Sequence, residues 1–141
     1  MYDVYGVGNA LVDSEYLVTE AILMESTFPK SGMSLVDEAS RVALLDLIEQ
    51  RHGIQRKALA SGGSAANTIA TVSGLGGKAF YSCKVADDAT GAFFLRDLSA
   101  QGIGCNYDET DCPEGVTGEC ISMITPDAVS YTHLTLPTTD R

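Results

Sequence analysis

The stretch that decides the fold reads Ser61-Gly62-Gly63-Ser64-Ala65-Ala66-Asn67-Thr68, and it joins an apolar run at residues 57–60 to an Ala-rich helical segment. Two adjacent glycines let the backbone turn sharply and approach a ligand closely, because no Cβ is in the way. Ser64 is the expected N-cap of the helix, whose first turn leaves backbone N–H groups without internal partners. Asn67 adds an amide that both donates and accepts hydrogen bonds. The stretch therefore suits a hydroxyl-bearing ligand, or else it is a tight turn followed by a solvated amide.

Composition favours a globular protein with no nucleic-acid surface. The chain has 141 residues, 45% of them hydrophobic, and 19 acidic against nine basic side chains give a formal net charge of −10. Such a charge repels phosphate backbones. No apolar run approaches the roughly 20 residues of a membrane span, and the N-terminus lacks the pattern of a signal peptide. We therefore expect a cytoplasmic protein without a membrane partner.

The cysteines indicate free thiols rather than a metal site. None of the four forms a CxxC pair, and the sequence has only two histidines to assist them. A metal site is therefore not expected, and some of the thiols are expected to be buried as small apolar residues. The four are Cys83, Cys105, Cys112 and Cys120.

The spacing Gly6-Val7-Gly8 also invites a dinucleotide-binding interpretation. That fingerprint requires a third glycine where helix and strand pack closely, and Leu11 occupies the position. A second β-prone run follows Asp13 instead of a helix. The pattern consequently argues against a dinucleotide site.

Strand and helix patterns alternate along the chain, which predicts an α/β fold with an open, parallel sheet. In such a sheet, ligands bind at the carboxyl ends of the strands, where the Gly62-Gly63 turn would lie. Strands are expected at 2–7, 15–18, 33–36, 79–83, 116–117 and 120–124. Helices are expected at 19–24, 37–52 and 64–74, and after Asp87 or Asp88 until Gly102 stops the last one. The acidic residues between Asp108 and Glu119 are expected to form a solvated face.

Several motifs occur in order along the chain: Gly6-Val7-Gly8-Asn9-Ala10-Leu11-Val12-Asp13, Gly62-Gly63-Ser64-Ala65-Ala66-Asn67, Leu75-Gly76-Gly77, Lys84-Val85-Ala86-Asp87-Asp88 with Gly91, and Leu98 through Gly102-Ile103. Together they resemble the ribokinase-like (PfkB) family of carbohydrate kinases, and its adenosine-kinase-like members in particular. The resemblance implies a ribokinase-like open three-layer α/β/α sheet, of which this chain is the N-terminal half, with a small β lid. It covers residues 1–128, with lid segments at about 14–36 and 106–128. In that lid, Tyr16, Leu17 and Met33 would line a water-excluding face, or else they belong to the core.

The same resemblance implies an ATP-dependent kinase that transfers a phosphoryl group to a hydroxyl of a sugar or nucleoside. Asp13 matches the acid that holds two hydroxyls of the acceptor, and Gly62, Gly63 and Asn67 match its other substrate-binding positions. In the family, the general base and the pocket for ATP and Mg²⁺ belong to the later half, in an Asp-x-x-Gly-Ala-Gly-Asp-like motif. That motif does not occur in this sequence. No catalytic, cofactor or metal residue is therefore expected here, and the chain alone is expected to be inactive.

Two further expectations concern partners and the C-terminal residues. The resemblance implies a homodimer through the lid, whereas a non-catalytic module that docks a partner on its acidic strands is the alternative of another class. Residues 129–141 depart from the family pattern and look like translated sequencing-adaptor DNA, with a divergent Thr-rich tail as the alternative. His133 within them is given no catalytic role.

Overall fold

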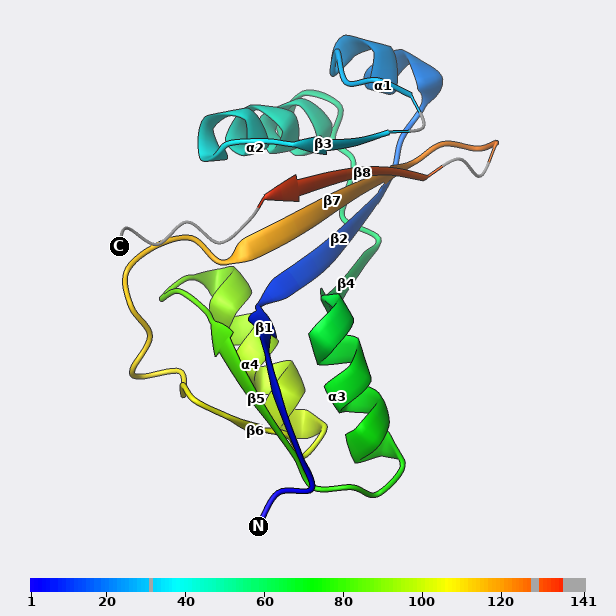
Figure 1. The fold of residues 1–141 in the computed structure, drawn as a ribbon. Coiled ribbons are helices and arrows are strands. Elements are labelled where there is room, and N and C mark those ends of the chain that lie inside the picture. Colours follow the sequence, from blue (N-terminus) through cyan, green and yellow to red (C-terminus); the bar gives the residue numbers. More distant parts are fainter. Residues whose placement is uncertain (31, 128–129, 136–141) are drawn as a thin grey trace. The chain divides into compact units, whose positions relative to one another are not determined.

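The computed structural model describes residues 1–30, 32–127 and 130–135, in two compact units (Figure 1). Unit 1 contains Met1–Val12 and Ala60–Gly118, and unit 2 contains Asp13–Leu59 and Glu119–Thr135. In the described part of the chain, no helix is both long and apolar enough to cross a membrane. The expected lid segments, residues 14–36 and 106–128, overlap unit 2 at 14–36 and 119–127, and the lid boundaries themselves stay a prediction.

The elements alternate between strand and helix as expected. In chain order they are β1 (Val4–Asn9), β2 (Leu11–Leu17), α1 (Glu20–Glu25), β3 (Met33–Leu35), α2 (Glu38–Leu45), the π-helix η1 (Asp46–Arg51), β4 (Ala58–Gly62), α3 (Ser64–Gly74), β5 (Ala79–Lys84), α4 (Ala89–Ala100), β6 (Gly104–Cys105), β7 (Gly118–Ile124) and β8 (Ser130–Thr135).

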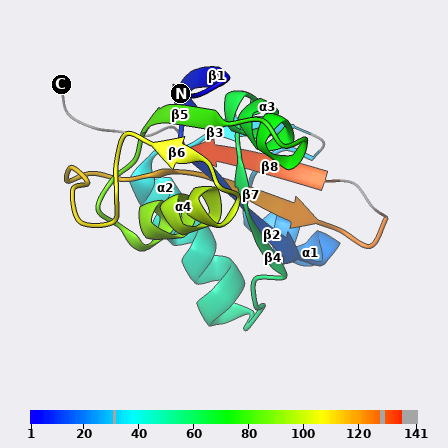
Figure 2. The same cartoon turned by 90° about the horizontal axis from the view of Figure 1, so that it is seen from below.

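Unit 1 is built on a parallel sheet with strand order β1-β5-β6 (Figure 2). β1 and β5 run in register from Val4 opposite Ala79 to Asn9 opposite Lys84. The helix α3 packs against β1 and β5, and α4 packs against β6. This arrangement confirms the expected parallel α/β architecture, because parallel strands require a crossover connection between them.

The glycines Gly6 and Gly8 serve packing in unit 1. A Cβ at Gly8 would lie 2.4 Å from the Tyr81 hydroxyl and 3.1 Å from the Ala65 Cβ, and one at Gly6 would lie 2.6 Å from Ile69. Tyr81 is fully buried, and its hydroxyl donates to the Asn9 carbonyl at 3.1 Å. The Gly6-Val7-Gly8 spacing therefore reflects close packing of β1 against α3 and Tyr81.

Unit 2 contains most of a mixed five-stranded sheet with the order β3-β8-β7-β2-β4. β7 runs antiparallel to β8, with Glu119 opposite Thr135, and β8 runs parallel to β3. The sequence assigns residues 129–141 to a non-family tail, yet the backbone of residues 130–135 forms β8. Residues 136–141 lie outside the described residues, so the nature of the tail stays a prediction.

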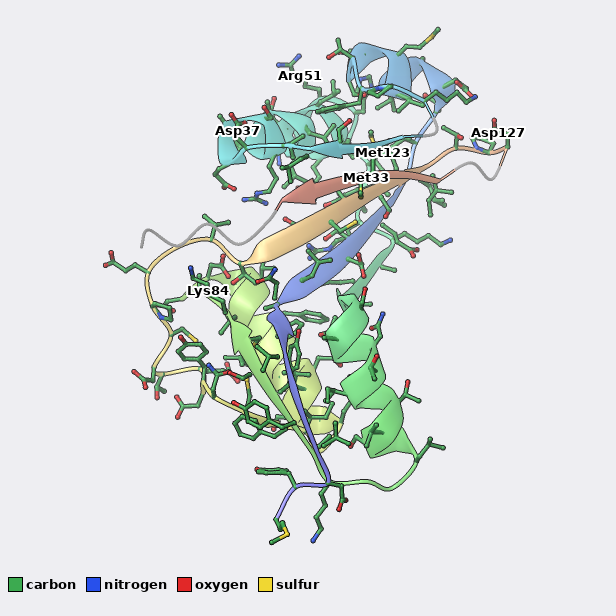
Figure 3. The ribbon with its side chains drawn as sticks, in the orientation of Figure 1. Met33, Asp37, Arg51, Lys84, Met123 and Asp127 are labelled. Carbon is green, nitrogen blue, oxygen red and sulfur yellow. The ribbon has the colours of Figure 1, made fainter. Side chains whose placement is uncertain are left out.

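The core of unit 2 lies between this sheet and the helices α1 and α2. Tyr16 and Met123 are at most 1% exposed and pack in one cluster with Ile22, Leu44 and Ile48. Figure 3 labels Met123. Tyr16 also donates to the Glu49 carboxylate at 2.5 Å. Of the residues considered for a lid face, Tyr16 is thus core, whereas Leu17 and Met33 are exposed.

Local rules place most of the helix ends correctly. Thr19, Asp37 and Asp88 cap α1, α2 and α4, each through its side chain. The expectation that Ser64 caps α3 is wrong, because Gly63 is the N-cap and Ser64 is already the first helical residue. Gly63 has no side chain to bond the first-turn N–H groups, so no side chain caps this helix.

The expectation that Glu119 belongs to a solvated acidic face is also wrong. Glu119 is 5% exposed on β7, where it accepts hydrogen bonds from the Ser14 hydroxyl at 2.6 Å and from Arg41 at 2.7 Å. A buried carboxylate needs such partners, because desolvation disfavours an unpaired charge. Asp108, Glu109 and Asp111, which precede Glu119 in the chain, are exposed, as expected.

Candidate functional site

The Gly62-Gly63 turn and the start of α3 form the part of the candidate site that lies in unit 1. Gly63 has φ +99°, a conformation that side-chain-bearing residues rarely adopt. The Asn67 N–H closes the first helical turn on the Gly63 carbonyl at 2.9 Å. The N–H groups of the preceding first-turn residues have no intrahelical acceptor, and they carry the positive end of the helix dipole.

Two side chains next to this turn retain hydrogen-bonding capacity. Asn67 is exposed, and its amide makes no side-chain hydrogen bond within the described residues. The Ser61 hydroxyl is buried, without a hydrogen-bond partner among the described atoms. A buried, unsatisfied hydroxyl costs about 1–3 kcal/mol, so it is unusual in a folded protein. Ser61 immediately precedes the glycine pair, and its unsatisfied state could not be seen in the sequence.

Asp13 is the candidate residue in unit 2, and it lies within the strand β2. Side chains alternate across a strand, so the carboxylate of Asp13 lies on the opposite face from the core residues Val12 and Ser14. Its neighbour is the Cys120 thiol on β7, which hydrogen-bonds to it. Burial first, and then the Asp13 charge and this hydrogen bond, raise the pKa of Cys120 to about 12. Cys120 is therefore a neutral donor to Asp13, a role that sequence reasoning missed because the cysteines carried no spacing signal.

Unit 1 itself brings the glycine turn close to the residues that lead into Asp13. A Cβ built on Gly63 would lie 3.4 Å from the Asn9 carbonyl oxygen and 3.8 Å from the Leu11 Cβ. Leu11 stands two residues before Asp13 in the chain. Residues of the 6–13 motif thus lie beside the Gly62-Gly63 turn within unit 1.

The second glycine pair, Gly76-Gly77, does not suit a phosphate. It lies at the C-terminal end of α3, where the helix dipole is negative. The Gly76 N–H donates to the Ser73 carbonyl at 2.9 Å and the Gly77 N–H donates to the Val72 carbonyl at 3.0 Å. Both donors are therefore already used, and the end of the helix that they close would repel an anion.

Metal ligands are likewise not grouped in the part of the chain that the structure describes: no three or more His, Cys, Asp or Glu side chains there are placed to hold an ion. Among the described residues, the Gly76-Gly77 donors are thus not available to a phosphate, and no such group of side chains is placed to hold a metal ion. What they offer is a carboxylate, an amide and backbone donors, which is a set suited to the hydroxyls of a small polar molecule.

The likeness of this chain to known carbohydrate kinases places it in a sugar-kinase-like class of protein. The model of the pfkB carbohydrate kinase family matches residues 35–134. The chain belongs to this family. The match extends into the segment at 129–141 that was expected to lie outside the family pattern.

Solved structures give the same assignment. A probable sugar kinase from Rhizobium etli is 33% identical, with a TM-score of 0.73, and the match covers 97% of this chain and 39% of that protein. The adenosine kinase of Sinorhizobium meliloti is 34% identical with the same TM-score, and the match covers 96% and 39%. The Anopheles gambiae adenosine kinase is 19% identical with a TM-score of 0.75, over 94% and 38%, and it shares the fold.

These likenesses confirm the expected ribokinase-like fold, in its N-terminal part. The chain spans about two fifths of the length of the solved structures that it matches. None of the curated proteins that were compared with the chain matches it.

Proposed function

We propose that this chain is the acceptor-binding part of an ATP-dependent kinase that transfers a phosphoryl group to a hydroxyl of a sugar or nucleoside. The observation that carries the proposal is the Gly63 turn, whose positive φ opens the N-terminus of α3 beside the residues leading to Asp13. Membership of the pfkB family and the likeness to a sugar kinase and to adenosine kinases support the substrate class. Gly62, Gly63 and Asn67 from unit 1 and Asp13 from unit 2 are the proposed binding residues.

Each of these residues has a distinct chemical role in the proposal. Asp13 is a carboxylate that accepts hydrogen bonds from acceptor hydroxyls, while Cys120 donates to it and so helps to hold it. Asn67 offers an amide that donates and accepts. Gly62 and Gly63 let the backbone approach the acceptor, because a Cβ there would take the space. Placement of this kind matters, because phosphoryl transfer depends mainly on orientation and electrostatic stabilisation.

Binding of acceptors to the purified chain tests the proposal. We expect saturable binding of a nucleoside or sugar, measured by titration calorimetry with a panel such as adenosine, ribose and fructose. Each hydrogen bond between a hydroxyl and a charged carboxylate is worth roughly 1.5–3 kcal/mol. Asp13→Ala should therefore weaken binding by about 10- to 100-fold, since about 1.4 kcal/mol is tenfold. Gly63→Val should weaken it similarly, by straining the turn and blocking close approach.

A matched control separates loss of the site from loss of charge. Asp46→Ala removes an acid of the η1 helix whose ion pair, among the described residues, is with the exposed Arg51, so it should leave acceptor binding unchanged. Equal losses in Asp13→Ala and Asp46→Ala would contradict the assignment of Asp13. Binding of a macromolecular partner that survives Asp13→Ala, with no binding of any acceptor, would instead support an interaction module.

ATP and Mg²⁺ enter the proposal through the family and not through the residues described above. We propose that the 141-residue chain alone does not turn over ATP, because the family's Asp-x-x-Gly-Ala-Gly-Asp-like motif does not occur in its sequence and its described residues hold no group of three or more potential metal ligands. The measurement is ATP consumption with the same acceptor panel. Acceptor-dependent turnover that Asp13→Ala abolishes would show that the chain holds a complete active site.

A further inference from the structure

Two thiols face each other in unit 1. Cys83 lies near the end of β5, and Cys105 is the last residue of the neighbouring parallel strand β6. The register sets Cys105 opposite Tyr81, and Cys83 stands two residues beyond Tyr81. Residues two apart lie on the same face of a strand. The two sulfur atoms are consequently on one face of the sheet, 3.8 Å apart.

The two thiols differ in their access to solvent. Cys83 is 7% exposed, and the Asn106 side chain binds both its backbone N–H, at 2.8 Å, and its carbonyl, at 3.1 Å. Cys105 is partly exposed and lines a pocket of about 220 Å³ together with Ile103 and Tyr107. A small solute thus has a route to Cys105, while Cys83 sits behind it as a buried neighbour.

We propose that Cys83 and Cys105 form a redox-sensitive pair, in which a peroxide oxidises Cys105 and Cys83 then closes a disulfide bond. In the first step the Cys105 thiolate attacks one peroxide oxygen, the O–O bond breaks, and the products are Cys105 sulfenic acid and hydroxide. In the second step the Cys83 sulfur attacks the sulfenic sulfur and the S–O bond breaks. The Cys83 proton and the departing hydroxyl leave as water. Two thiols and one hydrogen peroxide thereby give one disulfide and two waters.

The electrostatic surroundings of the pair favour this division of roles. The hydrogen bond from Cys83, together with the backbone N–H groups of Tyr107 and Asn106, lowers the pKa of Cys105 to about 6. The same hydrogen bond and burial raise the pKa of Cys83. When Cys105 is ionised, Cys83 must be the donor between them, so the exposed sulfur is the nucleophile and the buried sulfur keeps its proton. Thiolates, and not thiols, react with peroxides.

Closing the bond needs a modest local movement. The sulfurs must approach from 3.8 Å to about 2.05 Å, the length of a disulfide. The strand β6 has two residues and ends at Cys105, so a small shift of the Cys105 backbone breaks few sheet hydrogen bonds. Asn106 immediately follows, and its clamp on the Cys83 backbone keeps the two strand ends together during that shift.

The test is oxidation of the purified 141-residue chain with hydrogen peroxide, followed by thiol titration under denaturing conditions and peptide mass spectrometry. We expect the loss of two thiols per chain and a Cys83–Cys105 linked peptide. Cys105→Ser should abolish this loss. Cys83→Ala should leave a Cys105 sulfenic acid that dimedone traps. In contrast, Cys112→Ser should form the same linked peptide as the wild-type chain.

A second measurement, on the wild-type chain, does not depend on any variant folding. Cys112 is a matched comparison, because it lies in the same unit, and burial and neighbouring acids raise its pKa. Near pH 6 a thiol with an ordinary pKa of about 8.5 is less than about 1% thiolate. The lowered pKa of Cys105 gives it a larger thiolate fraction than that. The lower nucleophilicity of a low-pKa thiolate offsets part of this, so iodoacetamide should alkylate Cys105 at least about tenfold faster. Equal alkylation rates, or a disulfide that joins Cys112 to Cys105, would overturn the proposal.

Discussion

Removing the positive charge of Arg41 should destabilise unit 2 far more than removing a similar charge at the surface. Arg41 donates to the Glu119 carboxylate at 2.7 Å, and the side chains are 19% and 6% exposed. Breaking a buried ion pair by removing one partner costs about 3–5 kcal/mol, because a charge stays behind in a poorly solvated place. The Ser14 hydroxyl continues to donate to Glu119, so we expect the lower end, about 3 kcal/mol, for Arg41→Met.

Urea denaturation followed by circular dichroism measures this loss as a change in the free energy of unfolding. Arg51→Met is the control, because its pair with Asp46 is 65% and 49% exposed and such pairs are worth about 0–1 kcal/mol. The double variant Arg41→Met/Glu119→Gln should recover at least about 1.5 kcal/mol, because the neutral amide still accepts from Ser14. Equal effects of Arg41→Met and Arg51→Met, or no recovery in the double variant, would refute the reasoning.

Two further predictions concern unit 1. Burial first, and then the neighbouring Cys83 and Cys105, raise the pKa of Tyr81 to about 12. The stability that the protonated Tyr81 hydroxyl contributes is complete below its pKa in the unfolded chain, about 10, and is lost as the pH rises toward 12. Tyr81→Phe should therefore flatten the fall in unfolding free energy over that range, and identical pH profiles for both chains would contradict this. Val7 is 71% exposed beside the exposed Tyr5 on β1, which is an edge strand of the three-stranded sheet. An exposed apolar edge strand favours association between molecules, so Val7→Lys should reduce concentration-dependent self-association in sedimentation experiments. Leu75 is 85% exposed at the C-terminal end of α3, and the control variant Leu75→Lys should change self-association little.

The fold was predictable where it depends on residues close together in the chain. Asp37 and Asp88 each cap a helix three residues before the N–H that they bind, which is a spacing visible in the sequence. The alternation of buried and less buried side chains along β5 also follows from local rules, as does the positive φ of Gly53. Ser64 shows where such rules fail, because Gly63 takes the cap position without a side-chain bond.

What could not be predicted depends on pairs that are distant in sequence. Glu119 meets Ser14 across 105 residues and Arg41 across 78, so the acidic composition around it suggested a solvated face. The approach of Cys83 and Cys105 depends on which strands are neighbours, and their 22-residue separation matches no cysteine motif. The orphan hydroxyl of Ser61 is likewise a property of packing. The candidate residues Asp13, Gly62, Gly63 and Asn67 came instead from motifs, and their joint role stays a proposal.

Glycine illustrates why a motif alone does not establish a site. Gly8 would place a Cβ 2.4 Å from the Tyr81 hydroxyl, so its missing side chain serves packing in the interior of unit 1. A Cβ built on Gly63 would lie 3.4 Å from its nearest protein atom, the Asn9 carbonyl oxygen, so packing within the protein does not exclude a side chain there. The φ of +99° at Gly63 is what requires glycine, and backbone strain of that kind concentrates at functional turns. Glycine is therefore required for packing at Gly8 and for a positive φ at Gly63, and the binding proposal is built on the second.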